Sequence, residues 1–151
     1  MAELHRRRRV LVISNETVEA AILHDTIVST ANATEVMVVA PALNSRLRHW
    51  TNDEDAARRR AEERLGGCLS SLRKAGVHVD GWVGDADPLL AIADALAVFP
   101  ADELLVATHP EERSNWLAHD LVGRACARFG LPVIHLVVED AGVRFAARAA
   151  A

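Results

Sequence analysis

Two polar loops hold the residues whose chemical types could bind or transform a ligand. The loop at 15–17 contains Asn15 and Glu16, and the loop at 108–115 reads THPEERSN. Hydroxyl, amide, carboxylate and guanidinium groups can hydrogen-bond a small ligand, and the imidazole of His109 titrates near neutral pH. The chemistry that these residues suggest is binding of an anion or polar ligand, or acid–base catalysis by His109.

Most of these residues also have a structural interpretation. Arg113 is the only residue of its loop that is always positively charged near neutral pH. It is therefore the best candidate for an anion contact, although the two glutamates beside it would repel an anion. Ser114 and Asn115 are interpreted first as helix caps, a position that can also hold phosphate. Asn15 either contacts a ligand or caps a helix. The candidate ligand-binding residues are Asn15, Glu16, Thr108, His109, Arg113, Ser114 and Asn115.

The elements that must position these loops follow from five apolar runs that alternate with segments of helical period. Near-continuous apolar runs are typical of parallel strands buried on both faces. The predicted strands are 10–14, 35–40, 77–83, 103–108 and 133–138, and the predicted helices are 17–31, 53–75, 88–98 and a last one from Ser114 or Asn115 to 129. This order predicts an α/β fold with a single open parallel five-stranded sheet of order 3-2-1-4-5 and four helices on two faces. Ligands of such sheets bind beyond the carboxyl ends of strands 1 and 4, where the order reverses.

The chain is expected to form one domain with short flanking segments. A basic N-terminal arm at 1–9 precedes an α/β domain at 10–140, and an Ala-rich tail follows at 141–151. The arm is interpreted as solvated and as blocking an edge or end of the sheet. The tail is expected to fray unless Val143 and Phe145 dock it.

The composition, together with residues that begin or interrupt helices, further narrows the class of protein to which the chain can belong. A chain of 151 residues with a net charge of −4 is typical of one soluble domain and argues against a nucleic-acid binder. Without a membrane span or signal peptide, a cytoplasmic location is expected. Cys68 and Cys126 are expected to be buried reduced thiols, and the spacing of the histidines predicts no metal site. Asp87 is expected to cap a helix, and a glycine pair at 66–67 to loosen or bend one.

Two stretches resemble the universal stress protein family. They are VGDADPLLAIADALAVFPADELLVAT at 83–108 and FGLPVIHLVV at 129–138, within a resemblance that runs from about 10 to 138. The resemblance implies a Rossmann-like, adenine nucleotide alpha hydrolase-like fold, in agreement with the pattern above. It also implies a homodimer joined through strand 5, at 133–138, and a role in stress response.

The nucleotide motif of that family is not carried over. ATP-binding members have Asp-Gly-Ser after strand 1, where this chain has NET at 15–17. They have a GxxG loop after strand 4 and a later Gly-Ser/Thr pair, where this chain has 108–115 and 119–120. Their adenine contacts main chain just after strand 2, where Pro41 offers no N–H. Because glycines let backbone N–H groups approach phosphates, ATP and AMP are disfavoured and no cofactor is expected.

Three functions remain in competition. The first is a cytoplasmic stress-protein-like dimer that binds a partner or small ligand without turnover, and is therefore not an enzyme. The alternative is a binder of a nucleotide or phosphorylated metabolite that uses Asn15, Arg113, Ser114 and helix N-termini at the crevice between strands 1 and 4. The third is a hydrolase with His109 as acid or base, against which no phosphate-loop or nucleophile motif is present. The loop at 44–50 is either a lid over the crevice, with Trp50 stacking on a base, or a packed surface loop.

Overall fold

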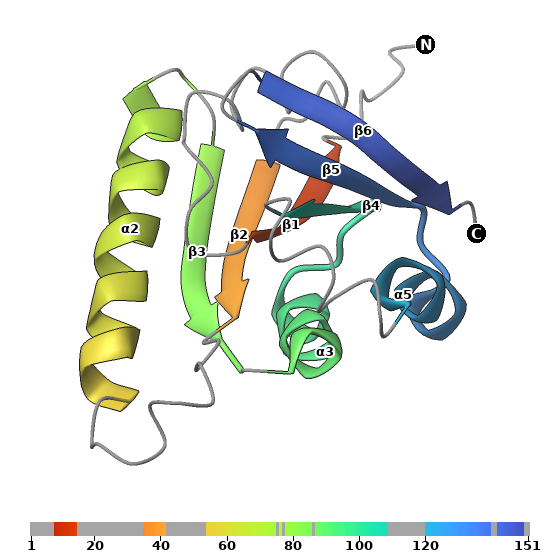
Figure 1. Ribbon diagram of the computed structural model, residues 1–151, viewed down its shortest axis with the longest axis horizontal. Coiled ribbons are helices and arrows are strands. Elements are labelled where there is room, and N and C mark those ends of the chain that lie inside the picture. Colours follow the sequence, from red (N-terminus) through yellow and green to blue (C-terminus); the bar gives the residue numbers. More distant parts are fainter. Residues whose placement is uncertain are drawn as a thin grey trace, which may run out of the picture.

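The computed structural model describes residues 8–14, 35–41, 54–74, 76, 78–85, 87–108, 120–139 and 142–149. Within these ranges, one six-stranded sheet has the order β3-β2-β1-β4-β5-β6 (Figure 1). The strands are β1 (Arg9–Ser14), β2 (Glu35–Pro41), β3 (His78–Gly84), β4 (Glu103–Thr108), β5 (Val133–Glu139) and β6 (Gly142–Ala149). The described helices are α2 (Glu54–Lys74), α3 (Pro88–Val98) and α5 (Leu121–Phe129). None of the helices in these ranges combines the length and the apolar character that a membrane crossing demands.

The first five strands confirm the predicted core of the fold. β1 pairs in parallel with β2 and β4, β2 pairs with β3, and β4 pairs with β5, which gives the predicted order 3-2-1-4-5. β1 is buried except at its first residue, and β4 is buried throughout. Their near-continuous runs of valine, isoleucine and leucine therefore reflect strands that are covered on both faces.

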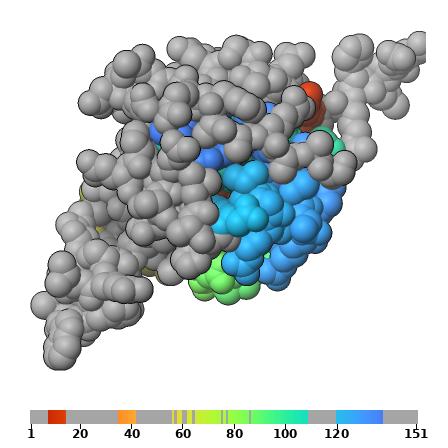
Figure 2. Space-filling view, turned by 45° about the vertical axis from the view of Figure 1, so that its right-hand side comes forward, coloured from red at the N-terminus to blue at the C-terminus, as the bar shows by residue number. Residues whose placement is uncertain are grey.

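The helices lie on two faces of the sheet, each over its own hydrophobic cluster. α2 packs Leu69 and Leu72 against one face. On the other face α3 and α5 lie side by side, and Figure 2 shows α5 in blue beside the green of α3. Because successive residues of a strand point to opposite faces, Val10 joins the α2 cluster and Leu11 joins the α3/α5 cluster.

α3 begins and ends where the sequence predicts. Asp87 has an extended backbone, and its Oδ1 accepts a hydrogen bond from the N–H of Leu89 at 3.0 Å. Pro88 follows at the first helical position, which suits its fixed φ and missing N–H. Ile92 and Ala95 then bury the inner side of the helix. The predicted capping role of Asp87 is confirmed.

α5 begins later than predicted. Asp120 has a φ of 47°, in the left-handed region, and its side chain accepts a hydrogen bond from the N–H of Gly123 at 3.3 Å. A right-handed helix cannot continue through that backbone conformation. The predicted single helix to 129 is therefore interrupted at Asp120, and its predicted start at Ser114 or Asn115 lies outside the described residues. Its end is as predicted, because Gly130 terminates it with a φ of 64°.

The segment expected as a fraying tail at 141–151 contains β6. This strand pairs antiparallel with β5, with a register shift between His135 and Leu136. The connection is short, since only residues 140–141 separate the two strands. Residues 133–137 of β5 are buried, and an open edge on such a strand invites association with other chains. β6 covers that edge, so the described sheet is not all-parallel and its terminal strands are β3 and β6.

The two cysteines lie on opposite faces of the sheet. Cys68 packs from α2 against the α2 cluster, and Cys126 packs from α5 against the α3/α5 cluster. Both are free, in agreement with the prediction, and both are partly buried where full burial was expected. Burial raises the pKa of the Cys68 thiol. Because the thiolate is the reactive form of cysteine, this thiol is a poor nucleophile at neutral pH.

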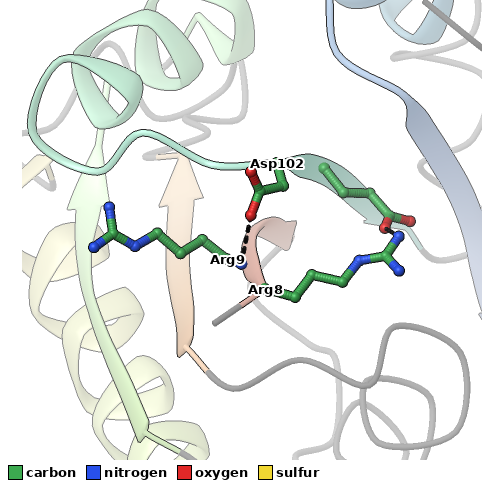
Figure 3. A network of polar contacts seen from close by, with 4 residues as sticks. Arg8, Arg9 and Asp102 are labelled. Carbon is green, nitrogen blue, oxygen red and sulfur yellow. Dashed lines mark hydrogen bonds and ion pairs between the residues drawn. The ribbon is translucent and has the colours of Figure 1, made fainter. Parts of the chain in front are cut away.

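Arg8 and Arg9 bind residues at the amino ends of β4 and β2, and Figure 3 shows the contacts of Arg8 and of the Arg9 backbone near the start of β4. Arg8 forms an ion pair with Glu103, whose side chain is almost completely buried at the start of β4. The N–H of Arg9 donates to Asp102 Oδ2 at 3.0 Å, and its Nε lies 3.0 Å from Glu35 Oε2. The last two residues of the basic arm therefore take part in the fold instead of being fully solvated.

Candidate functional site

The candidate site lies beyond the carboxyl ends of β1 and β4, where the strand order reverses. β1 ends at Ser14 and β4 ends at Thr108, and the register pairs Ser14 with Ala107. The two polar loops singled out in the sequence begin at these strand ends. The topology therefore brings the starting points of both loops together, as predicted.

The last side chains of β1 and β4 turn toward opposite faces of the sheet. Ser14 is buried. It lies two residues after Val12, so its side chain points to the same face of the sheet, which α2 covers. Thr108 is 0% exposed and follows Val106 on the face of α3 and α5. Its Oγ1 lies 2.8 Å from the Nε2 of His135. Of the predicted ligand-binding residues, Thr108 is the one that the structure describes, and its hydroxyl already has a partner in the core.

His135 is a buried polar residue that the sequence analysis did not single out. It sits in the middle of β5 and is 1% exposed. A buried imidazole needs hydrogen-bond partners, and the hydroxyl of Thr108 supplies one from the neighbouring strand. The available signal was the histidine inside the apolar run VIHLVV, which predicts a polar partner on an adjacent strand.

The connection from β3 to α3 is built for close packing and capping. A Cβ at Gly84 would lie 2.8 Å from the Cγ1 of Val39 and 3.1 Å from the Cβ of Ala91. Glycine at this position therefore lets α3 approach the sheet closely. Asp85 Oδ1 accepts a hydrogen bond from the N–H of Asp87 at 2.9 Å, and Asp87 itself caps α3. Both carboxylates thus have structural partners.

The N-termini of α3 and α5 already carry carboxylates. A helix N-terminus attracts anions because its first N–H groups are unpaired and its dipole is positive there. In α3 that anion is Asp87, and in α5 it is Asp120. A Cβ at Gly123 would lie 2.7 Å from Asp120 Oδ2, so the glycine makes room for the carboxylate. At these two helices, the chain itself therefore supplies an anion at the N-terminus.

Several predicted features lie outside the described residues. They are the helix at 17–31, the loop at 44–50, and the candidate residues Asn15, Glu16, His109, Arg113, Ser114 and Asn115. Pro41 is described as the last residue of β2, opposite Gly84. Across the described ranges, no three His, Cys, Asp or Glu side chains are grouped as a metal site would require.

Comparison with known proteins identifies no family. No protein-family model and no curated protein matches the chain. Among solved structures, it is similar to the Microcin C7 biosynthetic enzyme MccB in complex with N-formylated MccA, with a TM-score of 0.39 and 17% identity over 85% of this chain and 36% of that chain. A structure of E. coli MccB with succinimide has a TM-score of 0.42 and 14% identity over 92% of this chain and 40% of that chain. This chain thus spans well under half the length of those structures, and its fold is defined by its own strand order.

Proposed function

We propose that this chain is a cytoplasmic protein of the universal stress protein type that binds a partner or small ligand without catalytic turnover. It does not hold ATP in the manner of the ATP-binding members of that family. The observation that carries the proposal is the pair of aspartate caps, Asp87 and Asp120, on α3 and α5. A phosphate approaching either helix N-terminus would meet a carboxylate in place of unpaired N–H groups.

Two further observations support this function. The loop at 108–115 lacks the glycines that let a backbone cradle phosphates. The polar side chains described at this edge of the sheet hold the fold together, because Thr108 contacts His135 and Asp85 bonds the backbone of Asp87. The resemblance at 83–108 to the universal stress protein family supplies the protein class.

The second candidate is a binder of a nucleotide or phosphorylated metabolite. It is favoured by the strand order, which places the crevice of a doubly wound sheet between β1 and β4. In this case Asn15, Arg113 and Ser114 would contact the ligand.

Calorimetry separates the two candidates. We expect titration with ATP, ADP and AMP to give no binding heat at micromolar concentrations, because carboxylates already cap α3 and α5 and the loop at 108–115 lacks glycines that would cradle phosphates. Micromolar binding of ATP would overturn the proposal in favour of the second candidate. In that event Arg113→Ala should abolish binding with an unchanged melting temperature, whereas the matched control Arg128→Ala, in the exposed last turn of α5, should leave binding intact.

We further propose that the protein is a homodimer, as the resemblance implies, but through the edge of β6. The predicted contact through β5 would require β6 to leave the sheet, since β6 pairs along the whole of β5. A two-fold contact between β6 edges would continue the sheet across the dimer. Size-exclusion chromatography with light scattering should give twice the chain mass, and a monomer at high concentration would refute the proposal.

A further inference from the structure

β3 is a terminal strand of the sheet, and among the described residues no further strand lies along its outer edge. Such an edge is a template for pairing with another chain. This edge strand contains Gly81, where a Cβ would lie 2.4 Å from the backbone oxygen of Val38. Glycine is therefore required at this position, and it places no side chain beside the open edge.

Two charged side chains bind the backbone of this edge. Asp80 Oδ1 accepts a hydrogen bond from the N–H of Gly81 at 2.8 Å. Arg73, in the last turn of α2, donates from its Nε to the carbonyl oxygen of Val79 at 3.3 Å. The Arg73 Nη2 lies 3.8 Å from the same Asp80 oxygen, so the two side chains also attract each other.

The C=O of Val79 and the N–H of Gly81 are groups that a single added strand would bind. Val79 and Gly81 are two residues apart, so their N–H and C=O groups point to the same side of the strand. An added strand would donate a backbone N–H to the C=O of Val79 and accept the N–H of Gly81 through a backbone C=O, from one residue if it is parallel and from two residues if it is antiparallel. Arg73 supplies that donor and Asp80 supplies that acceptor.

We propose that Arg73 and Asp80 close the outer edge of β3 by occupying two hydrogen-bonding positions that an added strand would use. When they are removed, a second copy of the chain pairs along β3. The pair adds little to the stability of the monomer, because its side chains are 55% and 75% exposed and water screens their attraction. The pair instead prevents association along β3. Any further strand is then added at the opposite edge of the sheet, along β6.

The test compares two double variants that leave the net charge unchanged. Arg73→Ala with Asp80→Ala opens the edge, and Arg124→Ala with Asp94→Ala, which removes one exposed charge of each sign from α5 and α3, is the control. Light scattering over a concentration series should show an additional step of association for the edge variant alone. Melting temperatures of both should stay within a few degrees of the unmodified chain, as expected of surface substitutions.

Amide exchange of Gly81, measured by NMR, locates the contact. In dilute Asp80→Ala protein this amide should exchange roughly fivefold faster than in the unmodified chain, the ratio expected for one exposed hydrogen bond. In the associated double variant it should become protected again. Asp80→Asn keeps an acceptor oxygen and should stay closed. The proposal is overturned if the edge variant scatters like the control, or if it associates while the Gly81 amide remains fast.

Discussion

Replacing Gly81 with alanine should lower the free energy of unfolding by roughly 3 kcal/mol, the upper part of the range for overpacked positions. The new Cβ would lie 2.4 Å from the backbone oxygen of Val38 and 3.3 Å from the Cδ2 of Leu69. The oxygen belongs to β2, which is hydrogen-bonded on both sides and cannot move alone. Relief of the contact would separate β3 from β2. Urea unfolding followed by circular dichroism measures the loss.

The same substitution at Gly67 provides a control of opposite sign. Gly67 lies inside α2, is exposed, and has no atom within 4 Å of the position of an added Cβ. Alanine there should stabilise the protein by roughly 0.5–1 kcal/mol, because glycine loses more backbone entropy when a helix forms. Equal unfolding midpoints for the two variants would contradict the packing geometry at Gly81.

Removal of the Arg8 side chain should cost about 2 kcal/mol of stability, less than for a fully buried pair because solvent reaches the arginine. The cost arises at Glu103, which is 2% exposed and would keep a buried carboxylate without its cation. Thermal and urea unfolding of Arg8→Ala measure the effect. Arg58→Ala is the matched control, because its partner Glu62 is exposed and lies 3.5 Å away. That control should change stability by no more than about 0.5 kcal/mol.

A double-mutant cycle tests the cause. If the buried charge is responsible, Glu103→Gln should recover part of the loss in the Arg8→Ala background, so the two substitutions should not be additive. Strictly additive losses would show that Arg8 stabilises the protein through contacts other than the ion pair with Glu103.

The parallel part of the sheet was predictable because its strands are buried on both faces. Such strands have no polar side to interrupt the run of apolar residues, so VLVI in β1 and LLVA in β4 are readable as strands without knowledge of their neighbours. α3 was predictable to the residue, because Asp87 and Pro88 mark its start by local hydrogen bonding and φ restriction alone.

One error occurs where a partner distant in sequence decides the structure, and the other where a single residue adopts a left-handed backbone conformation. Residues 142–149 are rich in alanine, which has low strand propensity, and they form β6 because β5 offers an open edge. The start of α5 depends on the left-handed backbone conformation of Asp120. Aspartate tolerates this conformation, but the residue type alone does not predict it. Ser114 and Asn115 are better caps by residue type, and type was the only information available.

Only the location of the candidate site was predictable from sequence. The crevice at the ends of β1 and β4 follows from strand order. The engagement of Thr108 with His135 does not, because 27 residues separate them and their contact depends on the pairing of β4 with β5.

The positions of Cys68 and Cys126 allow the two halves of the hydrophobic core to be observed separately. The sheet lies between the two thiols, so a spectroscopic label on Cys68, attached at alkaline pH where its thiolate forms, reports from the α2 layer, and a label on Cys126 reports from the α3/α5 layer. A ligand or partner that loosens one layer alone would change one signal and leave the other unaltered. The native chain therefore carries separate reporters for its two layers, without any cysteine having to be introduced.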